Sequence, residues 1–591
     1  MRQRRNHSSP LEGEVGSHRD PGEGDSLRLH SVTKKAAPAP SPGASRRPLP
    51  QGERYFSFLV GLVVSISLLA GCGPREPAST GGPAVVRRLT EDQYRHVIAD
   101  IFGADIAVAG RFDPLNRTDG LLDLGSARAA ITPASYEQFD SMAHQIASQV
   151  LDERHRDILV PCKPAREDAP DDACAGQFLG KVGRLLYRRP LKDRELQAMT
   201  GLAHQATAAL GDFHGGLAYG LAGLLEAPSF LLVRDTSVDD PERPGSRHLD
   251  AYSKASRLSF LLWDSAPDDM LLNAAASGDL DSRTGLARQV DRMLTSPRLE
   301  TGVRAFFADM LGFDGFDTLA KDQVIYPAFT QPVGGDAAEQ TLRTVTDLLV
   351  RRNADYRDLF TTRETFLSRR LGALYRMPVG ATEGWERVDL PDGDPRVGIA
   401  TQVSFVALHS HPGRSSPTLR GKAVREILLC QKVPDPPANV DFALVQDTRN
   451  PNFRTARERL TAHRTQATCA GCHKIMDPIG LALENFDGAG QYRDQENGAP
   501  IDASGELDGT TFRNAHELGQ ALHDDPAATA CLVRRLYEYG TGRVPAKGET
   551  ELLAWLGRDF AAHGYQVSEL LRRIATSDAF YAVSPSSEDS R

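Results

Sequence analysis

The 591-residue sequence lacks an excess of positive charge and has no long basic run. It contains 69 Lys and Arg against 78 Asp and Glu, for a net charge of −9. Residues 1–71 carry ten Lys and Arg against six Asp and Glu, so the rest of the chain is more acidic still. Nucleic acids are bound largely through clustered cations that contact phosphates. The composition therefore argues against a nucleic-acid partner.

Several patterns that mark enzymes are missing as well. The sequence has no nucleophile elbow, no H-E-x-x-H motif, no phosphate-binding loop and no dinucleotide fingerprint. Strand patterns are sparse, and Val403–Leu408 is one of the few short runs that favour a strand. Helical periodicity dominates, with capping boxes at Thr90/Gln93 and Thr455/Glu458. We therefore expect a mainly α, multi-module helical protein.

Long apolar runs are also missing, apart from one near the N-terminus. Residues 55–70 are apolar, too short for a typical membrane span, and close on small residues, as in a signal peptide. The final Leu69-Ala70-Gly71-Cys72 resembles a bacterial lipobox, which implies that Cys72 is acylated and becomes the mature N-terminus. The alternative is a cysteine buried in a membrane anchor. Gly73 rather than Asp follows, so the lipobox resemblance implies sorting to the outer membrane. We therefore expect a lipoprotein of the cell envelope that faces the periplasm or the surface and is held by its N-terminal lipid.

Cysteine is scarce, with seven residues, and three neighbouring positions carry the main functional signal. Cys469, Cys472 and His473 form C-x-x-C-H, the spacing for covalent attachment of one haem c. Each thiol can add to one vinyl group of the porphyrin, and His473 then becomes the proximal iron ligand. A disulfide, a redox dithiol or half of a zinc site would use the same cysteines, but no second C-x-x-C or C-x-x-H completes a zinc site. Export favours the haem interpretation, because covalent haem is attached outside the cytoplasm. The position of the motif then predicts a cytochrome-c-like haem segment in the C-terminal third of the chain.

Methionine is scarce too, and none follows Met476. The downstream methionine that often completes iron coordination in small cytochromes is therefore absent. Four residues are candidates for the iron ligand on the opposite face of the haem: His409, His411, His463 and Met377. Each of them also suits a loop or surface position. Among the four we favour His409 or His411.

Charged residues near the motif have two interpretations each. Arg414, Arg420, Lys422 and Arg425 could bind haem propionates or form a solvated basic helix face, which we prefer. If the iron has no sixth ligand, Glu484 and Asp487 could act as acid/base groups. The alternative, which we prefer for this pair, is a turn that packs against the haem edge or caps a helix.

The four remaining cysteines are expected to form two disulfides, as suits an oxidising compartment. Cys162 and Cys174 bracket a short acidic loop that contains proline, so we pair them. That leaves Cys430 with Cys531. The alternative is that all four are buried free thiols.

Longer phrases of the sequence resemble a known family. They are Arg88–Tyr94, Tyr187–Leu191, Ala255–Trp263, Arg420–Glu426, Cys469–Asp487 and Ile501–Gly505. Together they resemble exported bacterial proteins built from five consecutive modules. The central modules are domains of unknown function 1592 and 1588, and modules 1587, 1595 and 1585 flank them. The resemblance implies the module order and a c-type haem signature in the fourth module, and it implies no substrate.

The sequence thus divides into expected segments. They are a disordered stretch or an extension from a misplaced start (1–54), a lipoprotein signal peptide (55–72), a linker (73–85), two helical modules (86–160 and 161–237), a central helical module (248–377), the C-x-x-C-H module (396–495), a C-terminal helical module (500–580) and a disordered tail (581–591).

The expected function is electron transfer through one covalent haem, with an unidentified redox partner. One alternative is a haem-dependent oxidoreductase, peroxidase- or oxygenase-like, with an open iron position. Another is a binding or scaffold lipoprotein in which the C-x-x-C-H is structural.

Overall fold

The computed structural model of the protein describes residues 75–584 except residue 242, residues 435–446 and residues 464 and 466. The predicted signal peptide, the lipidation site Cys72 and the tail beyond residue 584 lie outside this part. The described part is mainly helical, as predicted, with short two- and three-stranded sheets. None of its helices combines the length and apolar character that a membrane span requires.

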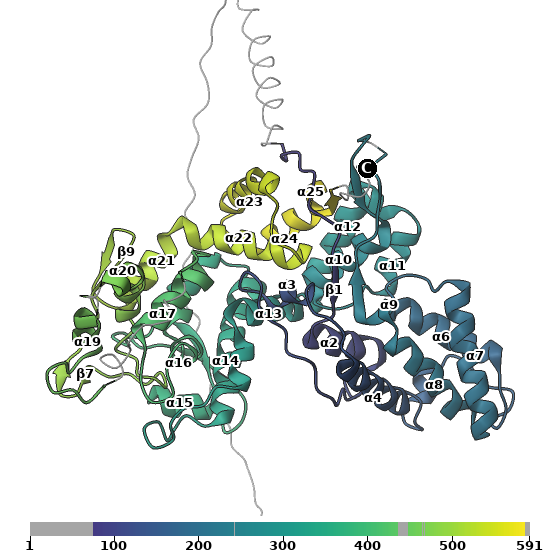
Figure 1. Ribbon diagram of the computed structural model, residues 1–591, viewed down its shortest axis with the longest axis horizontal. Helices are drawn as coiled ribbons and strands as arrows, with labels where there is room; N and C mark the ends of the chain where they lie inside the picture. The colour runs from purple at the N-terminus through teal and green to yellow at the C-terminus, as the bar shows by residue number, and fades with distance from the viewer. Residues whose placement is uncertain (1–74, 242, 435–446, 464, 466, 585–591) are drawn as a thin grey trace, which may run out of the picture. The chain divides into compact units, whose positions relative to one another are not determined.

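The first region is a set of helices closed by a two-stranded sheet (Figure 1). β1 (Val86–Arg88) pairs antiparallel with β2 (Leu232–Arg234), so the two ends of this region meet. Between them lie α2 (Glu91–Phe102), α3 (Leu122–Ser126), α4 (Pro133–Val150), α5 (Arg156–Leu159), α6 (Asp172–Leu186), α7 (Asp193–Leu210), α8 (Phe213–Glu226) and α9 (Pro228–Leu231). Buried side chains such as Tyr94 and Phe178 share one core. The expected modules 86–160 and 161–237 both contribute to it.

The central region alternates long helices with tight turns. Its elements are β3 (Ser237–Asp239), β4 (Arg247–Leu249), α10 (Ala251–Trp263), α11 (Asp269–Ala276), α12 (Arg283–Leu294), α13 (Arg298–Leu311), α14 (Gln331–Thr346), β5 (Glu364–Leu367), α15 (Arg369–Tyr375) and β6 (Glu386–Asp389). A π-helical turn at Asp347–Arg351 extends α14. β4 also pairs with β11 (Ala582–Val583), so the end of the described chain returns to the central region.

The region around the motif and the C-terminal region follow. Their elements are α16 (Val403–Leu408), α17 (Pro417–Ala423), α19 (Ala456–His463), α20 (Ala467–Leu481), β7 (Gln495–Glu496), β8 (Ala499–Pro500), β9 (Gly505–Leu507), β10 (Thr510–Phe512), α21 (Ala515–Asp524), α22 (Pro526–Thr541), α23 (Thr550–Ala562), α24 (Val567–Thr576) and α25 (Asp578–Tyr581). A large core joins these elements to the central helices, with Trp263, Ile479 and Tyr537 among its side chains.

Local signals for helix starts are confirmed. At α2, Gln93 N–H donates to Thr90 Oγ1 at 3.2 Å, and Thr90 N–H donates to Gln93 Oε1 at 3.3 Å. Before α19, the reciprocal bonds between Thr455 and Glu458 are 3.0 and 3.2 Å long. Each pair satisfies amide groups that a helix N-terminus would otherwise leave without a partner.

The strand prediction for Val403–Leu408 is wrong, because this segment is the helix α16. Val403–Ala407 are all buried, including Ser404. The segment has no solvent-exposed side, so its sequence shows no alternation of polar and apolar residues. A short run buried on every side does not distinguish a strand from a helix by its pattern. The helix is fixed by backbone bonds such as Val406 N–H to Gln402 C=O at 3.1 Å.

Both predicted disulfides are confirmed. Cys162 is bonded to Cys174 in the first turn of α6, across a sequence separation of 12 residues. Cys430, which follows the π-helical turn at the end of α17, is bonded to Cys531 of α22 across 101 residues. The second bond joins the segments before and after the C-x-x-C-H motif.

Candidate functional site

Helix α20 contains the whole C-x-x-C-H motif. Cys469, Cys472 and His473 follow one another in its first two turns. The Cys472 thiol is half-buried and free. The side chain of Cys469 lies outside the described part. The helix ends in the core, where Ile479 is fully buried.

Two glycines bring α20 into backbone contact with α17. A Cβ atom on Gly421 would lie 2.0 Å from the carbonyl oxygen of Met476, and one on Gly480 would lie 1.7 Å from that of Pro417. Both neighbours are backbone atoms, so no side-chain rotation could relieve such a clash. Glycine at these positions therefore sets how α20 is turned relative to α17.

This packing places His473 against a buried carboxylate. His473 Nδ1 lies 2.9 and 3.0 Å from the two carboxylate oxygens of Asp477, one helical turn further along α20. Asp477 is fully buried, and its Oδ1 also accepts a 2.9 Å hydrogen bond from Thr418 of α17. A carboxylate can only accept, so His473 donates from Nδ1 and a neutral ring keeps its lone pair on Nε2.

That arrangement fits a metal-ligating imidazole. Ligating histidines commonly donate their second ring N–H to a carboxylate or carbonyl, which fixes the tautomer and the ring orientation. His473 would bind an iron through Nε2, while Cys472 and Cys469 would hold the porphyrin. The sequence analysis assigned no role to Asp477 or Thr418. The i, i+4 spacing of His473 and Asp477 could have indicated their contact, because residues at this spacing are neighbours on a helix.

His463 lies beside His473. It ends α19, is 1% exposed, and its ring centroid is 5.0 Å from that of His473 at an interplanar angle of 77°. Such an edge-to-face contact leaves no room for a porphyrin between the two rings. His463 therefore packs directly against the His473 ring.

His409 and His411 lie in a separate environment at the end of α16. The His409 ring packs edge-to-face on Phe405, and its buried Nε2 has no hydrogen-bond partner among the described atoms. Burial, with the positive charges of Arg420 and Lys321, lowers the pKa of His409 to about 4. Burial, with the charge of Arg414 and then Lys321, lowers the pKa of His411 to about 4. Both rings are neutral at pH 7, the form that binds metals.

The described contacts do not link these two histidines directly to His473. None of its hydrogen bonds, ion pairs or ring contacts joins His409 or His411 to His473. The fourth candidate, Met377, packs against the core around Leu371 and Tyr375. A sixth ligand from these residues stays a prediction.

Lys321 and Arg420 organise the loop that carries these histidines. Lys321 Nζ donates to the carbonyls of Ala407, Ser410 and His411 at 2.7, 3.2 and 3.3 Å. Burial lowers the pKa of Lys321 to about 7, with a further contribution from the charge of Arg420. No local pattern points to Lys321, because the carbonyls that it contacts are about 90 residues away in the sequence.

The solvated-face interpretation is wrong for Arg420, and its binding of a propionate stays a prediction. It is 0% exposed, so it belongs to no solvated face. Its guanidinium donates to the backbone carbonyls of Val406, Leu483, Phe486 and Asp487, which leaves little to offer a propionate. Arg425 is also buried and is bonded to Asp508 at 2.6 and 2.8 Å.

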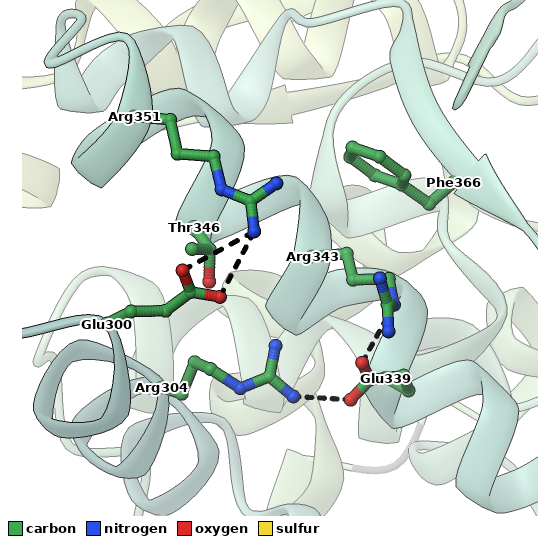
Figure 2. Close-up of a pocket in the computed structure, with 7 residues that line it drawn as sticks. All are labelled: Glu300, Arg304, Glu339, Arg343, Thr346, Arg351 and Phe366. Carbon is green, nitrogen blue, oxygen red and sulfur yellow. Dashed lines mark hydrogen bonds and ion pairs between the residues drawn. The ribbon is translucent and has the colours of Figure 1, made fainter. Parts of the chain in front are cut away.

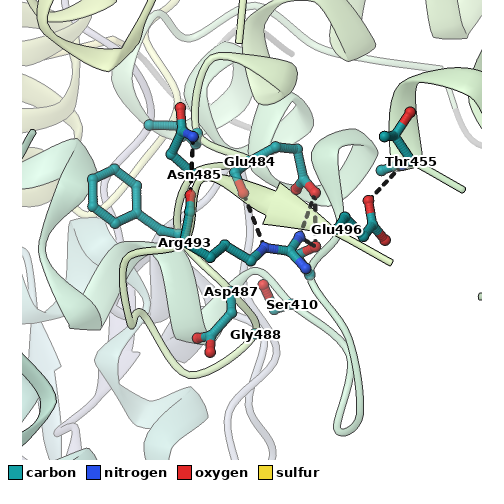
Figure 3. A network of polar contacts seen from close by, with 12 residues as sticks. Ser410, Thr455, Glu484, Asn485, Asp487, Gly488, Arg493 and Glu496 are labelled. Carbon is teal, nitrogen blue, oxygen red and sulfur yellow. Dashed lines mark hydrogen bonds and ion pairs between the residues drawn. The ribbon is translucent and has the colours of Figure 1, made fainter. Parts of the chain in front are cut away.

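Glu484 and Asp487 hold a turn together (Figure 3), and the packing of this turn against a haem edge stays a prediction. Glu484 is 2% exposed and accepts hydrogen bonds from Ser415 at 2.8 Å and Arg493 at 3.0 Å. Burial raises its pKa, although the charges of Arg420 and Arg493 oppose the shift. Asp487 Oδ1 accepts from the backbone N–H groups of Ala489 and Gln491, both at 2.9 Å, and so closes a turn.

A charged cavity of about 300 Å³ lies in the central region (Figure 2). Arg304 and Arg343 both pair with Glu339, and Arg351 pairs with Glu300 at 3.4 Å. Thr346 and Phe366 complete its lining. The lining carries three arginines against two glutamates, and each arginine already pairs with a glutamate, so we assign the cavity no ligand.

The fold and the motif together define a mainly helical, multi-module protein with a C-x-x-C-H helix. Five family models match the chain in succession, each described as a protein of unknown function: DUF1587 (87–152), DUF1595 (174–234), DUF1592 (249–377), DUF1588 (396–496) and DUF1585 (508–580). The chain belongs to this five-module family, as the sequence phrases indicated. No curated protein and no solved structure matches the chain. The whole α17–α20 site lies within the DUF1588 match.

Proposed function

We propose that the protein is a lipid-anchored, exported c-type cytochrome that transfers electrons through one haem. Cys469 and Cys472 would hold the haem by thioether bonds, and His473 would bind its iron. The haem would supply one-electron redox chemistry. The chain's own residues would orient the His473 imidazole, exclude water from the haem and bind a redox partner.

The observation that carries this proposal is the bond between His473 and Asp477. A buried carboxylate that holds Nδ1–H leaves Nε2 as the only ring atom for a metal. A merely structural C-x-x-C-H would not need an oriented imidazole. Thr418 and the two glycine contacts then fix the carboxylate itself.

The other cysteines support an extracytoplasmic site. Four of them form two disulfides, which persist in oxidising compartments. Covalent haem is attached in the same compartments. The proposed lipid at Cys72 would keep the protein at the membrane, with a polar partner on the periplasmic side or at the surface.

The same observation favours a second candidate, a haem-dependent oxidoreductase with an open iron position. A carboxylate partner makes the imidazole a more basic ligand and a stronger electron donor. Such a ligand suits iron that activates a bound small molecule as well as iron that only passes electrons.

The test is expression of the full chain with the haem-attachment machinery, followed by haem staining of a denaturing gel. We expect a stained band at the mature mass, and Cys472→Ala should abolish or greatly weaken it. Visible spectra of oxidised and reduced protein then separate the candidates, because a six-coordinate low-spin iron supports the cytochrome and a high-spin iron supports the oxidoreductase. An unstained wild-type band would overturn both and leave the scaffold interpretation.

The membrane anchor is tested separately. Cys72→Ser should release the protein from membranes or leave the precursor uncleaved. An unmodified N-terminus at another residue, found by mass spectrometry, would contradict the lipid anchor while leaving export possible.

A further inference from the structure

A second group of metal-ligating side chains lies far from the motif in sequence, on α4 and α8, which pack side by side (Figure 1). Asp140 and His144 lie one turn apart on α4, and Glu226 is the last residue of α8. One ligand atom from each of the three lies within 4.8 Å of the other two. His144 Nε2 is 3.8 Å from Asp140 Oδ1 and 3.9 Å from Glu226 Oε1.

These separations are too long for hydrogen bonds, and they contrast with other histidine–carboxylate pairs on the surface. His204 Nδ1 lies 2.8 Å from Asp172, and His155 lies 2.7 Å from Asp152. Metal bonds of about 2.0–2.2 Å hold neighbouring ligand atoms roughly 3 to 3.6 Å apart. The two separations from His144 therefore exceed this range by only a few tenths of an ångström, and the ligand atoms of Asp140 and Glu226 lie within 4.8 Å of each other.

Neighbouring side chains hold two of the three groups in place. The Tyr136 hydroxyl, one turn before Asp140, donates to Glu226 Oε2 at 3.2 Å and leaves Oε1 toward His144. Tyr219 packs edge-to-face on the His144 ring at 5.2 Å. Partners of this kind orient ligands in established metal sites.

The negative charges of the two carboxylates, Asp140 and Glu226, also favour binding of a cation. Glu226 is only 18% exposed, and burial together with the nearby Asp140 raises its pKa. Among the ion pairs of the described residues, His144 is the only basic group that either carboxylate meets. A divalent ion would neutralise both carboxylates at once.

We infer that Asp140, His144 and Glu226 bind a divalent first-row transition ion, with water completing its coordination. Two carboxylates and one imidazole suit Mn²⁺, Fe²⁺ or Zn²⁺. The ion would join α4, within the DUF1587 match, to α8, within the DUF1595 match. It would clamp the two family modules that share the N-terminal core.

The test is titration of the chelator-treated mature protein with Mn²⁺, followed by the loss of the free-ion EPR signal. Mn²⁺ is chosen because thiolates bind it poorly, so the C-x-x-C-H cysteines do not compete. We expect one bound ion per chain, a higher melting temperature with Mn²⁺, and binding at least about tenfold weaker in His144→Ala and Glu226→Gln.

His204→Ala is the matched control, because it removes a surface histidine that is already bonded to one carboxylate. It should bind Mn²⁺ as the wild type does. Tyr136→Phe should weaken binding less than His144→Ala. The inference is overturned if wild-type protein binds no Mn²⁺, or if His144→Ala and His204→Ala bind it equally.

Discussion

At the scale of single residues, the histidines of this chain differ mainly in what surrounds them. His473 faces a buried carboxylate that accepts its Nδ1–H, whereas His409 is buried with Lys321 and Arg420 nearby. The first environment orients a ring for a ligand at Nε2. The second opposes any positive charge on the ring. Each leads to a measurable consequence.

The bond from His473 to Asp477 predicts the tautomer and the basicity of His473. In haem-loaded protein, Asp477→Asn should shift the reduction potential in the positive direction, because a neutral amide makes the imidazole a weaker donor. In haem-free protein, ¹⁵N NMR of the neutral His473 ring should show the Nδ1–H tautomer in the wild type and a mixture of the Nδ1–H and Nε2–H tautomers in the variant. Thr418→Val is the control, because it removes only a secondary bond and should give smaller changes. An unchanged tautomer in Asp477→Asn would contradict the prediction.

Burial of neutral His409 predicts acid sensitivity. Its pKa is about 4 in the folded chain and about 6.5 ordinarily, so between these values the unfolded chain binds more protons. The free energy of unfolding should therefore fall as the pH falls from about 6.5 to about 4. His409→Gln should flatten that decline in urea unfolding of the haem-free protein at pH 7 and pH 5.

His204→Gln, at an exposed position on α7, serves as the control for acid sensitivity. Its pH dependence should match that of the wild type. A decline in His409→Gln as steep as in the wild type would show that other groups cause the acid sensitivity.

At the scale of elements, the site depends on direct backbone contact between α17 and α20. Thr418 reaches Asp477 only because Gly421 and Gly480 let the two helices approach so closely. Arg420, from the same turn of α17, ties the loop after α20 to α16 through backbone carbonyls. The helix pair thus acts as a frame on which His473 is oriented.

This contact predicts contrasting effects of two glycine substitutions in one helix. Gly480→Ala should lower the free energy of unfolding by roughly 1–3 kcal/mol, because its Cβ would meet the Pro417 carbonyl oxygen at 1.7 Å. Gly471→Ala, in the same helix, meets nothing within 4 Å and should be neutral or stabilise by up to about 1 kcal/mol. Urea unfolding of both variants is the measurement. Equal stability of the two would mean that the helices do not approach as described.

At the scale of the whole described part, the sequence modules do not correspond to separate cores. The core around Tyr94 and Phe178 draws on both N-terminal matches. The largest core runs from Leu121 to Val583 and includes side chains from the motif region and the C-terminal helices. Stability and the geometry of the site should therefore respond together to changes in long-range links.

The disulfide between Cys430 and Cys531 is such a link. It closes a loop across 101 residues, and on the chain-entropy model a loop of about 100 residues contributes about 4.7 kcal/mol. The Cys162–Cys174 bond spans only 12 residues, and a short loop of this kind contributes about 3 kcal/mol. Cys430→Ser with Cys531→Ser should lower the melting temperature more than Cys162→Ser with Cys174→Ser.

Thermal unfolding of the two double variants, with non-reducing peptide mapping of the wild type, checks this order. The 430/531 variant should also alter the haem spectrum, because the bond brackets the motif, whereas the 162/174 variant should leave it unchanged. The reverse order of stability would show that native-state strain or residual unfolded structure outweighs loop entropy.

The sequence by itself determined what depends on neighbours along the chain. The capping boxes, the mainly helical class and the C-x-x-C-H motif are local patterns. The pairing of Cys430 with Cys531 followed from elimination once the other cysteines had roles. The family phrases fixed the five-module identity.

Only the tertiary structure decided which distant groups meet. The segment Val403–Leu408 is a helix. Its sequence did not indicate this, because a segment buried on every side lacks the helical spacing of polar and apolar residues. Arg420 is buried because carbonyls more than 60 residues further along the chain converge on it. Among the ring contacts of the described residues, His473 meets His463 and neither His409 nor His411. Contacts of this kind depend on backbone approach across long sequence separations, which local periodicity and spacing do not encode.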